Sequence, residues 1–371
     1  MKTLSVVKAR ILIKNTLSHH NTHLQGVTHL SDKVAEVLGR GAGDLYLNDL
    51  TDLSPRAAAA LAKRKGDLIL NGLTSLSVET AEALAHFAGY LMLDGLAKLP
   101  DDVAGALAEF KGTNLDLDGL VSVSRKSLAS LSSSKAQKLS LGLARITVEQ
   151  AKMLEAYKGG LGLSIRRLSA AVAAILGERR GKLYMPFPTS LSVAAARELA
   201  NHRGYLDLNG LSRLSAGAAR KLAKHKGDID LSEVKKLSRE AAKALAKVEG
   251  VVGLDGLESI TPGVAAELAK RPDGLNLNRM TCLTDDMAKV LARRQGEVSL
   301  YGVEKLTDKQ VEILLPKYAA GTLGLFDGPR QRMETAWKDA RNNGHWPFRA
   351  NKKKSAARSW RAHRTDKERR A

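Results

Sequence analysis

Carboxylates and tyrosines are the residues of this chain whose types and spacing come closest to those of a chemical site. Asp116 and Asp118 are two residues apart in an alternating Leu-Asp-Leu-Asp stretch. On an extended strand, residues two apart lie on the same face, so the two carboxylates would stand side by side in solvent. Such a pair attracts a cation or a basic partner. Nothing in the surrounding sequence predicts the pocket that a catalytic or ligand site requires.

The chain also lacks the motifs of common catalytic and cofactor sites. It contains no phosphate-binding Gly-Lys-Ser/Thr loop, no His-Glu-x-x-His and no Gly-x-Ser-x-Gly. The nearest segment, residues 177–183, has a different spacing and no hydroxyl after its lysine. The N-terminal histidines have no spacing that specifies a metal site; they are His19, His20, His23 and His29. We therefore predict no catalytic residues, no metal, no cofactor and no enzyme activity.

Composition and charge narrow the class of protein further. The formal net charge is +20 over 371 residues, which favours a polyanionic partner. The single cysteine, Cys282, excludes an intramolecular disulfide framework and is typical of a reducing compartment. Lys8, Arg10 and Lys14 interrupt the N-terminal apolar stretch, and no run approaches the roughly 20 apolar residues of a membrane span. These features predict a cytoplasmic protein without membrane segments.

The elements that position the carboxylates come from an internal repeat. A Leu-x-Leu motif recurs at intervals of 22 to 24 residues, and a weaker fourteenth copy ends at Leu325. The second leucine position of the other copies is occupied by Leu24, Leu47, Leu70, Leu93, Leu117, Leu141, Leu163, Met185, Leu208, Leu231, Leu254, Leu277 and Leu300.

Each part of the repeat has a physical reason. Leu-x-Leu alternates with period two and predicts a short strand with one buried face. Asn-Gly or Asp-Gly follows in several copies and predicts a turn. A serine or threonine comes next, with Pro100 as the exception, and its hydroxyl is suited to cap the Ala-rich helix that follows. Glycines such as Gly66 and Gly204 stand where we expect that helix to end.

Units of this kind bury their apolar faces only when they are stacked. The sequence therefore predicts an α/β repeat fold, a solenoid of about 13–14 units with a parallel β-sheet on the concave face and short α-helices on the convex face. Alanines at the inward helical positions, such as Ala57 and Ala58, would let the helices approach the sheet closely.

These units resemble the leucine-rich repeat family, in a short variant similar to its cysteine-containing subtype. The signature is carried by Leu283-Thr284-Asp285 and Leu306-Thr307-Asp308 at two helix starts, and by Leu-Ala near most helix ends. The resemblance covers about residues 21–327. It implies a leucine-rich-repeat solenoid whose concave sheet face binds other proteins. The chain departs from the subtype in its shorter units and in having Leu at the buried turn position.

The positive charge has two interpretations. Lysines and arginines gather at the expected helix ends, as in Lys63, Arg64 and Lys65. Cations there oppose the negative end of the helix dipole, an effect of about 0.3–1 kcal/mol each. Alternatively, these helix ends form a basic ridge that attracts phosphate.

The exposed strand positions carry the opposite charge. Ten acidic residues, against only Lys138 and Lys182, lie directly before, between or after the paired leucines. Five of the seven tyrosines lie there as well, and Phe187 replaces a turn glycine beside Tyr184. Tyr is common at interfaces, whereas Asp is usually depleted in strands. A merely solvated sheet face is the alternative. We predict that a basic or mixed-charge polypeptide binds here through Tyr46, Tyr90, Asp94, Asp116, Asp118, Tyr184, Phe187, Tyr205, Asp207, Asp230, Asp255 and Tyr301.

The repeat stops after residue 328. Residues 329–371 hold fourteen Lys/Arg against four Asp/Glu and all three tryptophans, which predicts a disordered basic tail with at most a short helix near residues 334–341. Three roles fit this tail: solubility, contact with the chain's own concave face, and binding of nucleic acid by phosphate contacts and stacking. The residues for nucleic acid would be Trp337, Trp346, Arg349, Lys352, Lys353, Lys354, Arg358, Trp360 and Arg361. We thus expect an N-terminal cap segment (1–20), a solenoid (21–328) and a tail (329–371).

Overall fold

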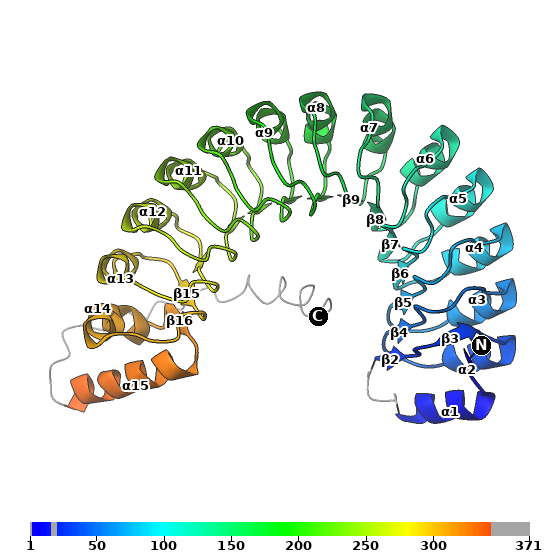
Figure 1. Cartoon of the computed structure of the whole chain (residues 1–371), viewed down its shortest axis with the longest axis horizontal. Coiled ribbons are helices and arrows are strands. Elements are labelled where there is room, and N and C mark those ends of the chain that lie inside the picture. Colours follow the sequence, from blue (N-terminus) through cyan, green and yellow to red (C-terminus); the bar gives the residue numbers. More distant parts are fainter. Residues whose placement is uncertain (1, 16–20, 343–371) are drawn as a thin grey trace.

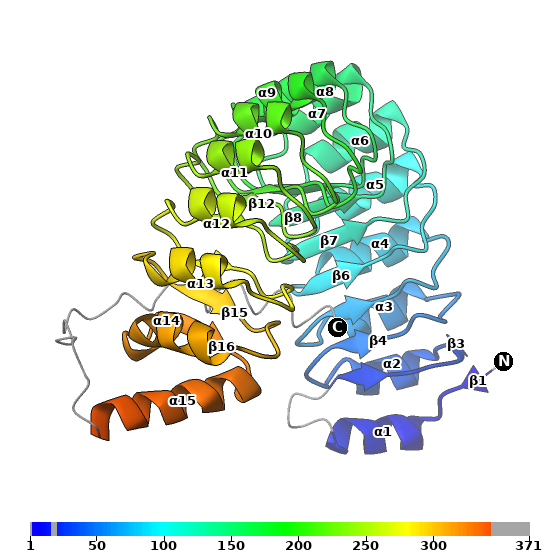
Figure 2. The same ribbon diagram turned by 60° about the vertical axis from the view of Figure 1, so that its left-hand side comes forward.

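The computed structural model of the chain describes residues 2–15 and 21–342. Figure 1 shows a curved array in which short strands line the inner face and helices cover the outer face, with α1 at one end and α15 at the other. Figure 2, turned by 60°, shows the strands lying side by side along the array. This architecture confirms the prediction of a leucine-rich-repeat solenoid, with a parallel sheet on the concave face and helices on the convex face.

The first unit holds both β2 and β3, and β3 pairs with β1 at the N-terminal end; from β4 onwards each unit holds one strand. They are β1 (Lys2–Thr3), β2 (Thr22–His23), β3 (Val27–His29), β4 (Leu45–Tyr46), β5 (Leu68–Ile69), β6 (Tyr90–Met92), β7 (Asn114–Leu117), β8 (Lys138–Leu141), β9 (Gly160–Leu163), β10 (Leu183–Tyr184), β11 (Leu206–Asp207), β12 (Ile229–Asp230), β13 (Val252–Gly253), β14 (Leu275–Asn276), β15 (Val298–Leu300) and β16 (Leu323–Leu325).

The helices alternate with these strands. They are α1 (Val6–Asn15), α2 (Asp32–Leu38), α3 (Pro55–Leu61), α4 (Val78–Ala85), α5 (Asp101–Ala108), α6 (Arg125–Ser132), α7 (Val148–Glu155), α8 (Ala170–Glu178), α9 (Val193–Leu199), α10 (Ala216–Leu222), α11 (Arg239–Leu245), α12 (Pro262–Leu268), α13 (Asp285–Ala292), α14 (Asp308–Ala319) and α15 (Asp327–Asn342).

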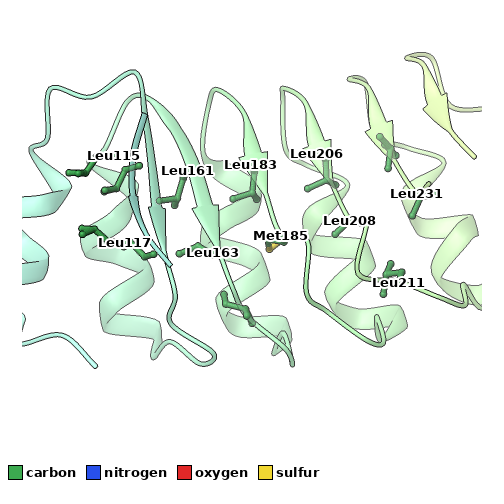
Figure 3. Packing of buried hydrophobic residues seen from close by; sticks show 14 of the residues in the cluster. Leu115, Leu117, Leu161, Leu163, Leu183, Met185, Leu206, Leu208, Leu211 and Leu231 are labelled. Carbon is green, nitrogen blue, oxygen red and sulfur yellow. The ribbon is translucent and has the colours of Figure 1, made fainter. Parts of the chain in front are cut away.

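The leucines of successive units pair in register. An 11-stranded parallel sheet runs from β2 to β13, and a 3-stranded sheet joins β14, β15 and β16. The first leucine of each motif stands opposite the first leucine of the next, as in Leu45 with Leu68 and Leu183 with Leu206. Figure 3 shows the side chains of this kind in the middle of the array, among them Leu183 and Leu206, pointing from the strands towards the helices. Both leucine columns are buried, so the repeat supplies one continuous core.

The predicted helix caps are present. The Ser54 hydroxyl accepts a hydrogen bond from the Ala57 N–H at 3.0 Å, and the side chains at the same position of ten later units do the same. Ser31 and Pro100 occupy the position without such a bond. The hydroxyl satisfies an N–H that the first helical turn leaves free, so each helix begins at a fixed residue.

The glycines between helix and strand have a role that differs from our expectation. Helix α9 ends at Leu199 and its C-cap is the right-handed Ala200, so Gly204 does not terminate it. A Cβ on Gly204 would lie 2.1 Å from the carbonyl oxygen of Gly181, and one on Gly66 would lie 2.3 Å from that of Gly43. Residues at these positions must be glycine because consecutive coils approach closely. The predicted helix-stop role is therefore wrong.

Several helix-end cations are buried and bond to the preceding coil. Arg64 donates from Nη1 to the Leu38 carbonyl at 2.5 Å and from Nη2 to Ala42 at 2.9 Å, and Leu38 is the last residue of α2. Arg179 bonds in the same way to the carbonyl of Leu154 in α7 at 2.6 Å. These guanidinium groups therefore cap the C-terminal end of the helix in the preceding unit. This supports the interpretation that helix-end cations stabilise helix dipoles, with the difference that the buried arginines act on the preceding helix.

The C-terminal end also differs from our expectation. Residues 329–342, which we expected to be largely disordered, belong to the sixteen-residue helix α15. Met333 of this helix is fully buried, and α15 packs against α14. Helix α15 therefore covers the last coil of the solenoid, because the apolar edge of that coil would otherwise face water.

Candidate functional site: the acidic concave face

The first half of the concave face contains a compact group of carboxylates. Asp94 follows β6, Asp116 lies in β7 and Asp118 follows β7. Asp116 is buried, and its Oδ2 accepts a hydrogen bond from the Tyr90 hydroxyl at 2.5 Å. The Asp118 N–H donates to Asp94 Oδ1 at 3.2 Å and to Asp116 Oδ1 at 3.1 Å, which holds the three side chains together. We call Tyr90, Asp94, Asp116 and Asp118 the first acidic cluster.

Burial and mutual repulsion change the ionisation of this cluster. Burial, followed by the nearby charge of Asp116, raises the pKa of Asp94 to about 6. Burial and the charges of Asp116 and Asp94 raise the pKa of Asp118 to about 7. The Asp118 side chain is nevertheless exposed, so solvent screens part of the shift in its pKa. None of these three carboxylates makes an ion pair with a cation in the described part of the chain.

A second group of tyrosine and aspartate side chains lies further along the face. The Tyr205 hydroxyl donates to Asp230 Oδ2 at 3.2 Å, and Asn209 Nδ2 donates to the same oxygen at 2.9 Å. Asp207 stands opposite Asp230 in the paired strands β11 and β12. The rings of Tyr184 and Tyr205 are in tilted contact, with centroids 5.6 Å apart. We call Tyr184, Tyr205, Asp207 and Asp230 the second acidic cluster.

Lys138 connects the two clusters. This residue, in β8, places its ammonium 4.4 Å from the centroid of the Tyr184 ring, a cation–π distance. Its positive charge also lowers the pKa of Asp118, partly offsetting the shift caused by the carboxylates. The structure therefore brings eight of the predicted residues into two preorganised groups, with a lysine between them.

The remaining predicted residues lie apart from these groups. Tyr46, in β4, stacks on His23 with centroids 4.1 Å apart. Asp255 follows β13 and is half-buried. Tyr301 follows β15 and Phe187 follows β10, and both side chains are exposed. That Phe187 takes part in binding a polypeptide stays a prediction.

Sequence reasoning missed an asparagine ladder behind the carboxylates. Asn71 Oδ1 accepts the Asp94 N–H at 3.1 Å, and Asn209 Oδ1 accepts the Ser232 N–H at 2.9 Å. Asp94 Oδ1 makes the equivalent bond to Asp118 N–H. The recurrence of Asn or Asp directly after the second leucine was the signal for this ladder. This ladder holds the backbone of neighbouring coils together where each strand ends, and it orients the Asp94 carboxylate.

Other candidate sites are weaker. Within residues 2–15 and 21–342, no three His, Cys, Asp or Glu side chains are arranged to hold a metal ion. No helix in these ranges is long and apolar enough to cross a membrane. A shallow depression on the convex side is lined by Arg125, Glu149 and Lys152 of α6 and α7.

Several residues named above lie outside the described ranges. Of the predicted nucleic-acid-binding residues only Trp337, half-buried in α15, is described. Those outside the described residues are His19, His20, Trp346, Arg349, Lys352, Lys353, Lys354, Arg358, Trp360 and Arg361.

Comparison with known proteins shows similarity at a distance. No protein-family model matches the chain, and no curated protein does. Among solved structures, a leucine-rich-repeat protein of Leptospira interrogans aligns with a TM-score of 0.41 and 20% identity, covering 88% of this chain and 82% of that one. An internalin of Listeria monocytogenes aligns with a TM-score of 0.43 and 14% identity, covering 87% of this chain and 89% of that one. The fold assignment rests on the repeated units of the chain itself.

Proposed function

We propose that this chain is a non-enzymatic scaffold that binds a basic polypeptide segment on its concave face. The observation that supports this most directly is the first acidic cluster, in which burial, together with the nearby charge of Asp116, raises the pKa of Asp94 to about 6. A lysine or arginine of the partner would relieve this repulsion. Binding would thus be favoured twice: by a charge-assisted hydrogen bond, and by relief of the repulsion among the carboxylates.

The tyrosines give the face its second property. Tyr90 and Tyr205 are each tied by their hydroxyl to a carboxylate, so their rings are held in place before a partner arrives. Rigid aromatic side chains provide contact area at a low entropic cost. An extended peptide lying across β6 to β12 would meet charged and aromatic groups in both clusters.

The experiment is a selection of peptides from a random displayed library on the immobilised full chain. We expect enrichment of Lys and Arg, and loss of binding of the selected peptides to the D94N/D118N/D207N variant by tenfold or more. The matched control is E82Q/E155Q/E312Q, which removes the same charge from exposed positions on the convex helices and should bind normally.

Two results would count against the proposal. Selected peptides without cationic residues would show that the carboxylates do not define the partner. Equal loss in the control variant would show that only the overall charge of the chain matters. Isothermal titration of one selected peptide at pH 8 and pH 5.5 adds a third check, because protonation of Asp94 should weaken binding at the lower pH.

A further inference from the structure

One edge of the solenoid carries a row of exposed cations. Each helix leads into the next strand through a short loop, and in four consecutive coils, from α7–β9 to α10–β12, these loops are basic. The exposed cations of the four loops, which we call the basic edge, are Lys158, Arg180, Lys182, Arg203, Lys224 and Lys226. The same stretch contains two exposed carboxylates, Glu155 and Glu178, at the ends of their helices.

The stacking of the coils forces these like charges together. Arg180 and Arg203 are paired directly by a parallel β-bridge, so their backbones are separated by roughly the 4.8 Å of adjacent strands. Like charges opposite each other in this way are destabilising. Within the described residues, no hydrogen bond or ion pair of Arg180, Arg203 or Lys226 offsets this repulsion. The repulsion within this row of cations therefore lowers the stability of the chain when no partner is bound.

The basic edge is not needed to stabilise the helix ends. In two of these loops, a separate and buried residue bonds to backbone carbonyls of the preceding coil. Arg179 donates to Leu154, Tyr157 and Gly159, and the ring of His225 is 3.0 Å from the Gly204 carbonyl. The exposed cations next to these buried groups are therefore free to act on something outside the chain.

We propose that the basic edge binds the phosphate backbone of a single-stranded nucleic acid. A single file of cations, one or two per coil, matches a linear polyanion. The four coils that carry the row succeed one another along the curve of the solenoid, from α7 to α10 (Figure 1). A flexible single strand follows such a curve, whereas a duplex resists bending over so short a length. The carboxylates of the concave face repel phosphate, so they confine the strand to the edge.

An anionic membrane is the other polyanion to consider. Surfaces that lie on membranes combine cations with apolar side chains that enter the bilayer. None of the exposed large apolar side chains of the described residues falls in the four loops of the basic edge. The narrow, apolar-free row thus fits a nucleic acid better than a lipid surface.

The test uses the full chain, a fluorescein-labelled 20-nucleotide oligo(dT) and fluorescence anisotropy from 50 to 200 mM salt. The variant R180Q/R203Q/K226Q removes three cations from the basic edge. We expect affinity at 50 mM salt to fall by tenfold or more. Because each lost phosphate contact removes about 0.7 from the slope of log K against log salt, the slope should become shallower by about 2. Residues 343–371 are unchanged in the variant, so their contribution is constant.

The matched control is R166Q/R213Q/K236Q at the opposite edge of the solenoid. These cations are exposed too, and Arg213 and Lys236 are paired by the same kind of parallel bridge. We expect the control to bind as the unmodified chain does. Equal losses in both variants, or no loss in the first, would overturn the assignment.

Vesicles containing phosphatidylserine test the membrane alternative. The assignment would also be overturned if R180Q/R203Q/K226Q lost binding to these vesicles but kept its binding to the oligonucleotide. Unfolding midpoints of both variants verify that the fold is retained.

Discussion

Replacing Asp94 by Asn should make the chain more stable at pH 8, although it removes a charged side chain from the candidate site. The physical reason is the raised pKa of Asp94, which is about 6 in the fold against an ordinary value of 3.8. Asn fits the position because Asn71 and Asn209 occupy the equivalent place in other coils and accept the same type of backbone hydrogen bond. The variant loses only the 3.3 Å bond from Asn71 Nδ2.

The magnitude follows from the pKa shift. About two pKa units correspond to about 3 kcal/mol. Because Asp94 is only half-buried, solvent screening reduces this to about 1–2 kcal/mol. The folded chain holds the Asp94 proton at pH values where the unfolded chain has lost it, so the penalty grows as pH rises from about 4 to about 6 and is complete above that. Asn has no such penalty at any pH.

The assay is urea unfolding of D94N and of the unmodified chain at pH 8 and pH 4, followed by circular dichroism. We expect D94N to be more stable by about 1–2 kcal/mol at pH 8 and to be nearly equal at pH 4. D52N, at an exposed aspartate in the turn after β4, is the control and should show no such pH-dependent gain. An unchanged stability of D94N at pH 8, or the same gain at both pH values, would refute the account of the first acidic cluster.

Two further predictions concern the stacking of the coils. Gly204→Ala should cost several kcal/mol in unfolding free energy, because its Cβ would lie 2.1 Å from a backbone carbonyl. Gly105→Ala should be neutral or stabilising by up to about 1 kcal/mol, because a Cβ there meets nothing within 4 Å and Ala favours the helix; urea unfolding compares the two. Burial lowers the pKa of His225, so the unfolded chain takes up this proton first and stability falls as pH drops below about 6.5. His225→Phe should therefore be less stable at pH 7.5 by about 1 kcal/mol, through the lost bond to the carbonyl, and the gap should narrow at pH 5; a gap independent of pH would contradict this.

Much of the fold was predictable from local pattern. The leucine columns, the capping position occupied by Ser54, and the alanines that allow close helix packing each follow from residue type and spacing within one unit. Repetition then fixed the stacking, because a unit that cannot bury its own apolar face must pair with a copy of itself. The acidic and aromatic character of the concave face was predictable in the same way, since period two separates inward from outward side chains.

The sequence by itself thus determined the unit, its number of copies and the composition of each surface. Only the tertiary structure decided how residues one coil apart interact. It placed Asp118 against Asp94, gave Gly204 its role beside a neighbouring carbonyl, buried Arg64 against α2 and left other helix-end cations exposed. It also turned the expected start of the tail into α15, which buries Met333. The physical reason is that burial, hydrogen bonding and pKa depend on distances between neighbouring coils, and those distances are set by packing.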